Sequence, residues 1–191
     1  MNLPNKLTVL RILLAPVFLA LLTIRFPGHF LLALLVFIAA SLTDLADGKI
    51  ARSRGLVTDF GKFLDPLADK MLTTAAFLGF IWLDFGCGVV WITMIVLTRE
   101  FLITSLRLTA AGSGRVIAAN IWGKAKTVCQ MTAIITTLVY YVAGDLSATP
   151  GILPDILYVL SAVLLWLSAG MTLLSGAIYL RDNAGFINTN R

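Results

Sequence analysis

Residues 30–42, FLLALLVFIAASL, are followed directly by residues 43–52, TDLADGKIAR. The first stretch is apolar except for Ser41, as in a membrane helix, yet a helix needs about 20 apolar residues to cross a bilayer core. The turn residues Pro27 and Gly28 precede it and stop a helix from extending backward. This helix can therefore complete a crossing only by extending forward into the polar stretch.

The next apolar stretch has the opposite arrangement. Residues 71–83, MLTTAAFLGFIWL, are again short, and residues 61–70, GKFLDPLADK, precede them. A helix here can extend only backward, because the turn Gly86-Cys87-Gly88 follows. Two short helices thus bring the same group of acids toward membrane depth, and these acids are Asp44, Asp47, Asp65 and Asp69.

The composition of the whole chain agrees with a membrane protein. Of 191 residues, 59% are hydrophobic and 13% are charged, whereas a soluble domain is about 45 to 50% apolar. We therefore predict an all-α, polytopic membrane protein with one domain over residues 1–191. Six transmembrane helices are expected, at about 5–24, 29–52, 60–83, 88–109, 121–143 and 152–180.

The distribution of basic residues predicts the orientation. With the N-terminus in the cytoplasm, almost all lysines and arginines fall on the cytoplasmic side, and Arg25 alone falls outside. Both termini are then cytoplasmic. The formal charge of +5 is explained by this bias, and no basic tail suggests a nucleic-acid partner.

The spacing of the four aspartates predicts a metal site. Asp44 and Asp47 are three residues apart and Asp65 and Asp69 four apart, so each pair shares a helix face. An ionised aspartate at a helix centre costs about 2.5 to 3.5 kcal/mol, so four should persist only in a wet cavity with compensating positive charge. Oxygen ligands favour Mg²⁺ or Mn²⁺. The alternative, which we disfavour, is a solvated loop in which the acids pair with Lys49, Arg52, Lys62 and Lys70.

These residues carry a family resemblance. The run Asp44-x2-Asp47-Gly48-x2-Ala51-Arg52-x8-Gly61-x3-Asp65-x3-Asp69 resembles the complete signature of the CDP-alcohol phosphatidyltransferases, at all eight positions. Three further segments resemble the branch of the family that forms phosphatidylglycerophosphate. They are the opening PNKLTVLRILLAPVF, the segment TREFLITSLRLTAAGSGRVIAANIWGKAKT and the closing LLSGAIYL. The resemblance covers most of the chain.

The resemblance implies a reaction and assigns roles. CDP-diacylglycerol would donate its phosphatidyl group to sn-glycerol 3-phosphate, with CMP as the second product. The four aspartates would hold two metal ions, and Asp69 would also be the general base, although it could be a fourth metal ligand only. The pocket for the CDP-lipid would be formed by Asp44, Gly48, Ala51, Arg52 and Gly61.

An anionic acceptor needs cationic side chains within the bundle. The candidates for binding its phosphate are Arg99, Arg107, Lys124 and Lys126, and Arg107 is the strongest because an arginine fork suits phosphate. The alternatives are that the two lysines extend to lipid headgroups and that Arg99 pairs with Glu100 or Asp65. Candidates for the cavity rim are Asn5, Thr8 and Arg11, which could instead cap the helix or contact headgroups.

Two other functions compete with this prediction. A cardiolipin synthase of the same family would use phosphatidylglycerol as acceptor, and a cation transporter would bind its ion through the aspartates. A transporter is disfavoured because the acids cluster at one side of the membrane. The compact chain without a transit-peptide pattern leads us to expect a bacterial plasma (inner) membrane, with the active site on the cytoplasmic side, and the resemblance implies a homodimer.

Overall fold

The computed structural model describes residues 3–54, 59–112, 121–146 and 151–184. Of residues 3–4, 44–54, 59–63, 65, 66 and 69 it describes the helical backbone alone. The described residues form six helices and no strand, which confirms the predicted all-α class and places every helix within three residues of its predicted limits. The helices are α1 (Leu3–Thr23), α2 (His29–Arg54), α3 (Asp59–Trp82), α4 (Val89–Gly112), α5 (Ile121–Leu146) and α6 (Ile152–Asp182).

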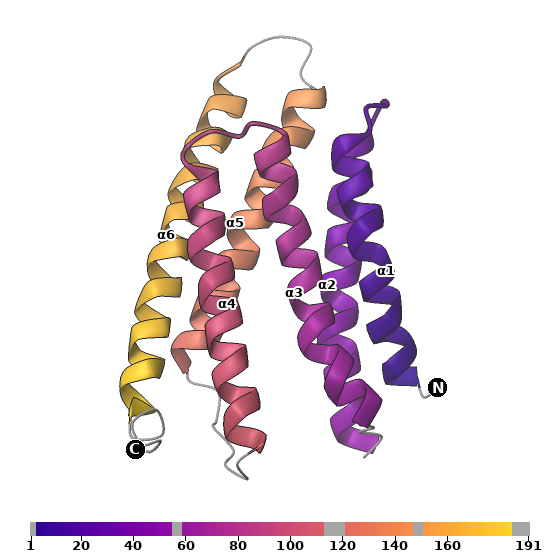
Figure 1. The fold of residues 1–191 in the computed structure, drawn as a ribbon. Coiled ribbons are helices and arrows are strands. Elements are labelled where there is room, and N and C mark those ends of the chain that lie inside the picture. The colour runs from indigo at the N-terminus through magenta and orange to yellow at the C-terminus, as the bar shows by residue number, and fades with distance from the viewer. Residues whose placement is uncertain (1–2, 55–58, 113–120, 147–150, 185–191) are drawn as a thin grey trace.

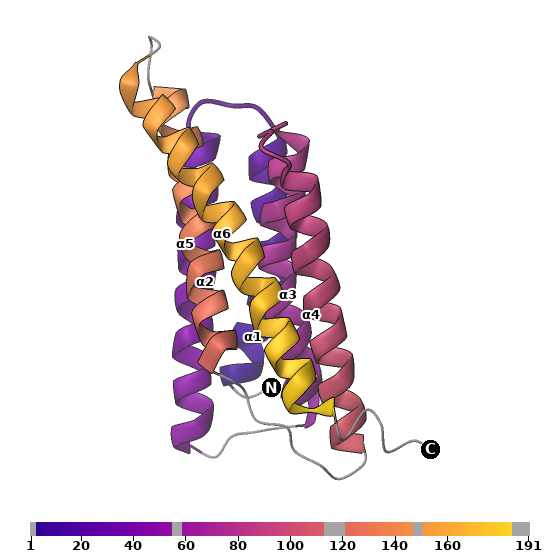
Figure 2. The same cartoon turned by 90° about the vertical axis from the view of Figure 1, so that its left-hand side faces the viewer.

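The helices form a closed ring rather than two stacked layers. Around the ring the order is α1, α3, α4, α6, α5 and α2, and α2 then packs against α1 (Figures 1 and 2). The connections α1–α2 and α3–α4 lie at one end, which we call the apical end. The end at which α1 begins and α6 ends is called the basal end. Residues that are far apart in the chain therefore meet at each end of the ring.

The inside of the ring is packed with large apolar side chains. Phe18 of α1, Phe37 of α2, Phe77 of α3 and Leu138 of α5 are all fully buried. Leucines, valines and tryptophans are exposed on the outer faces of the same helices, as expected where lipid replaces water as the solvent. The type of an apolar residue therefore does not show whether it faces the inside or the outside of the ring.

Four helices are long and apolar enough to cross a membrane. They lie at Asn5–Thr23, Val89–Gly112, Ile121–Leu146 and Ile152–Asp182. Among the residues with described side chains, α2 and α3 offer only the shorter apolar segments His29–Thr43 and Lys70–Trp82. The structure shows that each short apolar stretch and its polar extension form one continuous helix, α2 at His29–Arg54 and α3 at Asp59–Trp82. The shortage of apolar length itself follows from the sequence. A crossing by all six helices stays a prediction.

Aromatic rings close the apical end of the ring. Phe85, in the α3–α4 connection, lies 5.1 Å from Tyr158 of α6 and 5.7 Å from Tyr140 of α5, measured between ring centroids. Tyr141 of α5 stacks on Phe30 of α2 at 5.0 Å. These contacts join α2, α5, α6 and the α3–α4 connection, so the apical end is filled by side chains.

The α3–α4 connection is a tight turn built on left-handed backbone. Gly86 and Gly88 have φ of 77° and 76°, where a side chain would strain the backbone. The amide of Phe85 donates to the carbonyl of Phe80, 3.1 Å away, which closes the end of α3. The indole Nε1 of Trp166 donates to the Cys87 carbonyl at 2.8 Å and fastens the turn to α6.

Candidate functional site

The four predicted metal ligands lie on two helices that meet at the basal end. Asp44 and Asp47 belong to the last turns of α2, and Asp65 and Asp69 to the first turns of α3 (Figure 1). The backbone is helical at all four positions, so the predicted sharing of a helix face within each pair applies. Their side chains lie outside the described residues.

The same holds for the predicted CDP-lipid pocket. Its members also fall on the basal turns of α2 and α3, and the side-chain surroundings of Asp44, Gly48, Ala51, Arg52 and Gly61 lie outside the described residues. Among the side chains that the structure does describe, no group of three or more His, Cys, Asp and Glu could hold a metal ion. His29 lies at the apical end, where its Nδ1 donates to the Leu21 carbonyl at 2.9 Å.

Next to the predicted metal-binding aspartates, the carboxylate of Glu100 contacts cationic side chains from three helices. Glu100 of α4 forms an ion pair with Lys126 of α5, and its Oε2 lies 3.4 Å from Nζ of Lys70 on α3. Its Oε1 also lies 3.3 Å from a guanidinium nitrogen of the adjacent Arg99. We call these four residues the Glu100 cluster. Its described side chains carry three positive charges and one negative charge, a surplus that favours binding of an anion.

The cluster settles two alternatives from the sequence. Arg99 does pair with Glu100, as one alternative proposed. Lys126 is only 3% exposed and turns into the bundle, so its extension to lipid headgroups is wrong. Such burial of an ammonium group requires a partner, which Glu100 provides. Gln130, one turn further along α5, is also 3% exposed and was not identified from the sequence.

Lys70 connects the cluster to the predicted catalytic helix. Its ammonium group donates to the Glu100 carbonyl oxygen at 2.9 Å and to the Thr104 hydroxyl. Lys70 directly follows Asp69 in α3. These bonds therefore fix the backbone of α3 against α4 beside the predicted base, which the sequence alone did not suggest.

Arg99 packs against a glycine on each of two neighbouring helices, α5 and α6. A Cβ added at Gly176 of α6 would come within 3.2 Å of Arg99 Cγ, and one at Gly123 of α5 within 3.8 Å of Arg99 Nη2. The arginine side chain thus passes close to the backbone of α6 and reaches α5. The glycines make room for it between the two helices.

The other predicted acceptor residues have exposed side chains. Arg107 lies two turns after Arg99 on α4, and Lys124 lies in the first turn of α5. Both are at the basal end, but neither forms an ion pair that the structure describes. Whether they contact the acceptor stays a prediction.

The three predicted rim residues occupy one face of α1. Asn5, Thr8 and Arg11 are spaced by three residues and are 7%, 2% and 3% exposed, respectively. Since α1 packs against α2 and α3, this buried polar face meets the two helices that carry the aspartates. Headgroup contact by these side chains is thereby wrong, whereas their place at the rim stays a prediction.

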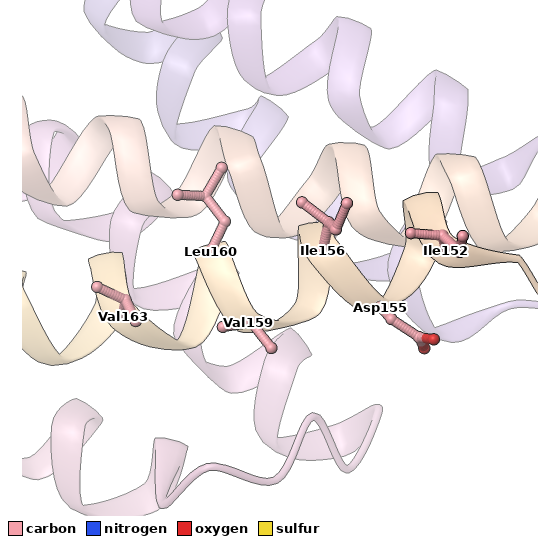
Figure 3. Close-up of a pocket in the computed structure, with 6 residues that line it drawn as sticks. All are labelled: Ile152, Asp155, Ile156, Val159, Leu160 and Val163. Atoms are coloured by element: carbon pink, nitrogen blue, oxygen red, sulfur yellow. The ribbon is translucent and has the colours of Figure 1, made fainter.

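A surface groove on α6 lies far from this region. It follows the first turns of the helix, at the apical end, and its lining is apolar except for Asp155 (Figure 3). The residues that line it are Ile152, Asp155, Ile156, Val159, Leu160 and Val163. A groove lined by one helix, with a single carboxylate, offers no set of groups for catalysis.

The sequence is similar to known proteins over most of its length. The family model described as CDP-alcohol phosphatidyltransferase matches residues 1–177. The CDP-diacylglycerol–glycerol-3-phosphate 3-phosphatidyltransferase of Bacillus subtilis (strain 168) is 37% identical, over 99% of this chain and 98% of its own. The enzyme of that name from Rickettsia bellii is 33% identical over 94% of both chains. A probable phosphatidylglycerophosphate synthase of Mycobacterium tuberculosis is 43% identical over 70% of this chain and 64% of its own.

Proposed function

The chain belongs to the CDP-alcohol phosphatidyltransferase family, and from this premise we propose that it transfers the phosphatidyl group of CDP-diacylglycerol to sn-glycerol 3-phosphate. The products are phosphatidylglycerophosphate and CMP, in the synthesis of anionic phospholipids. The observation that carries the proposal is the similarity, over nearly the whole chain, to relatives named for this activity.

The reaction exchanges the phosphoanhydride bond of CDP-diacylglycerol for a phosphoester bond to the acceptor. A hydroxyl oxygen of glycerol 3-phosphate attacks the lipid-linked phosphorus of CDP-diacylglycerol, and the bond from that phosphorus to the CMP oxygen breaks. The hydroxyl proton passes to a base, for which we propose the carboxylate of Asp69. The alternative role for Asp69, as a metal ligand only, is tested below.

The helical backbone at both aspartate pairs is compatible with a metal site. Spacings of three and four residues in α2 and α3 give two carboxylates per helix face, and hard oxygen donors suit Mg²⁺ or Mn²⁺. Asp44, Asp47, Asp65 and Asp69 would hold two such ions. When bound, these ions would neutralise charge on the phosphoryl oxygens and on departing CMP. Gly48, Ala51, Arg52 and Gly61 would line the CDP pocket.

The Glu100 cluster supports an acceptor that carries its own phosphate. Buried Lys126, together with Lys70 and Arg99, leaves a positive surplus beside the helix of Asp69. A phosphate monoester has a charge of about −1.5 to −2 at neutral pH, so it neutralises this surplus better than the monoanionic phosphodiester of phosphatidylglycerol. This favours glycerol 3-phosphate over the acceptor of a cardiolipin synthase. Arg107 and Lys124, exposed nearby, would guide the anion to the site.

A cation transporter is the competing function outside the family. It would need a path between both ends of the ring, whereas the aromatic rings of Phe30, Phe85, Tyr140, Tyr141 and Tyr158 pack together at the apical end. This packing leaves no such path through the described residues at the apical end and therefore disfavours a transporter.

The location follows from the distribution of charge. We propose a bacterial plasma membrane protein in which α2 and α3 complete their crossings through the polar turns of the aspartates. Arg107, Lys126 and Arg181 lie at the basal end and Arg25 at the apical end, so the basal end should face the cytoplasm. Glycerol 3-phosphate would then enter from the cytoplasm and CDP-diacylglycerol from the bilayer. The family resemblance supports a homodimer.

The decisive experiment measures CMP release. Purified protein is incubated with CDP-diacylglycerol, Mg²⁺ or Mn²⁺, and glycerol 3-phosphate or phosphatidylglycerol. We expect CMP with glycerol 3-phosphate and divalent metal, and none after chelation with EDTA. Release with phosphatidylglycerol alone would contradict the proposed acceptor, and no release with any alcohol would contradict the enzyme activity.

A further inference from the structure

Two buried polar atoms face the α4–α6 boundary without a hydrogen-bond partner among the described residues. They are Nε of Arg99 on α4 and the hydroxyl of Tyr179 on α6. Tyr179 is only 4% exposed, so bulk water does not solvate its hydroxyl. A buried polar group without a partner costs about 1 to 3 kcal/mol, and in a native structure it is usually satisfied by water or a ligand.

The two groups belong to one region of the basal end. Gly176, which lies against Arg99, is one turn before Tyr179 on the same side of α6. The phenol is also close enough to Arg99 and Arg107 to interact with both positive charges. Tyr179 is thus near two of the residues that the sequence assigned to the acceptor phosphate. It lies in the closing segment LLSGAIYL, to which the resemblance gave no residue role.

The chemistry of these groups selects the kind of ligand. Arginine Nε–H can only donate a hydrogen bond, and a tyrosine hydroxyl beside two guanidinium groups also has a donor to offer. Donors and positive charge together suit an oxyanion. The guanidinium nitrogen of Arg99 that contacts Glu100 leaves Nε available, so the arginine can bind the carboxylate and a second oxyanion at once.

We propose that the hydroxyl of Tyr179 and Nε of Arg99 bind a phosphate oxygen of a substrate, between α4 and α6. This inference rests on the proposed function and adds a residue to it. The phosphate can come from glycerol 3-phosphate or from the lipid substrate. The first source is consistent with the neighbouring Glu100 cluster, and the kinetic experiment separates the two.

Tyr179→Phe tests the proposal because it removes the hydroxyl and keeps the ring. If the hydroxyl binds the acceptor phosphate, KM for glycerol 3-phosphate should rise about three- to tenfold, with KM for CDP-diacylglycerol unchanged. If it binds the lipid phosphate, KM for CDP-diacylglycerol rises instead. Tyr158→Phe, at the apical end of the same helix, is the matched control and should leave both constants unchanged.

Thermal stability distinguishes binding from a structural role. Loss of a hydroxyl without a protein partner should leave the melting temperature of the substrate-free protein unchanged or raise it slightly. Unchanged KM values for both substrates would overturn the proposal, and a lowered melting temperature with unchanged KM values would assign the hydroxyl to a structural water.

A binding measurement keeps the inference independent of turnover. Inorganic phosphate should raise the melting temperature of the unmodified protein, and Tyr179→Phe should weaken this shift while Tyr158→Phe retains it. If the unmodified protein released no CMP, the proposed function would fail, yet this phosphate shift would still support or overturn the site. An equal shift in all three proteins would overturn it.

Discussion

Lys126 of α5 is buried against the carboxylate of Glu100 on α4, so that two residues 26 positions apart form one ion pair inside the ring. Glu100 also contacts Lys70 of α3 and its own neighbour Arg99. One carboxylate therefore holds α3, α4 and α5 together. The same carboxylate keeps these three cations at the place where we propose that an anionic acceptor binds.

Glu100→Gln should destabilise the protein. The amide keeps the shape of the side chain but leaves three cations close together in a site of low polarity, so we expect a loss of about 3 kcal/mol of unfolding free energy. Thermal unfolding in detergent measures this loss. Lys6→Gln, which changes an exposed lysine of α1, is the control and should change stability by less than about 0.5 kcal/mol. Equal stability of both variants would show that Glu100 is not the centre of the cluster.

Asp69→Asn should abolish CMP release while CDP-diacylglycerol still binds. An amide cannot accept the proton of the attacking hydroxyl, so turnover should fall by at least about 100-fold, as expected for loss of a general base. Binding of the lipid and of Mn²⁺, followed by spectroscopy, should remain measurable. An active variant would remove Asp69 from the role of base. Asp145→Asn, at the apical end of α5, should retain full activity.

Gly176→Ala and Gly123→Ala each add one methyl group to a helix near Arg99, but we expect them to differ in KM for glycerol 3-phosphate. The new Cβ at residue 176 would lie 3.2 Å from Arg99 Cγ, so Arg99 must shift by a few tenths of an ångström. The Cβ at residue 123 would lie 3.8 Å from Nη2, an ordinary contact. We expect KM for glycerol 3-phosphate to rise severalfold in the first variant only. Equal KM values would show that the position of Arg99 does not matter for the acceptor.

The thiol of Cys87 reports the orientation in the membrane. It lies in the apical α3–α4 connection, and burial raises its pKa above the ordinary value of 9.0. In a Cys129→Ser background, a membrane-impermeant maleimide should label it from outside spheroplasts and not from the cytoplasmic side of inverted vesicles. Because less thiolate is present at a given pH, the labelling rate should still be rising above pH 9. Labelling from the cytoplasmic side alone would reverse the proposed topology.

Part of the site could be predicted because its signals are local. The limits of all six helices follow from turn residues such as Gly28 and Gly86, and from apolar runs between them. The spacings of Asp44 with Asp47 and of Asp65 with Asp69 place each pair on one helix face as soon as the backbone is helical. The short apolar segments of α2 and α3 likewise follow from counts along the chain.

Contacts between helices could not be predicted in the same way. Lys126 was expected either at the acceptor or at headgroups, and nothing in the pattern of α5 indicated that it turns toward Glu100. In a membrane protein the lipid-facing side of a helix is as apolar as the side in the core, so periodicity does not reveal which residues face inward. Tyr179 lies in the segment LLSGAIYL that carries the resemblance, but its residue type and spacing alone do not indicate that it faces inward toward Arg99.

The sequence by itself determined the helices, the position of the four aspartates along them and the membership of the chain in a family, since these depend on neighbours in the chain and on a spaced signature. Only the tertiary structure decided the order of helices around the ring, the pairing of Glu100 with Lys70, Arg99 and Lys126, and the place of Tyr179 beside Arg99. Such pairings depend on how each helix is rotated about its axis. That rotation is set by the packing of all six helices together.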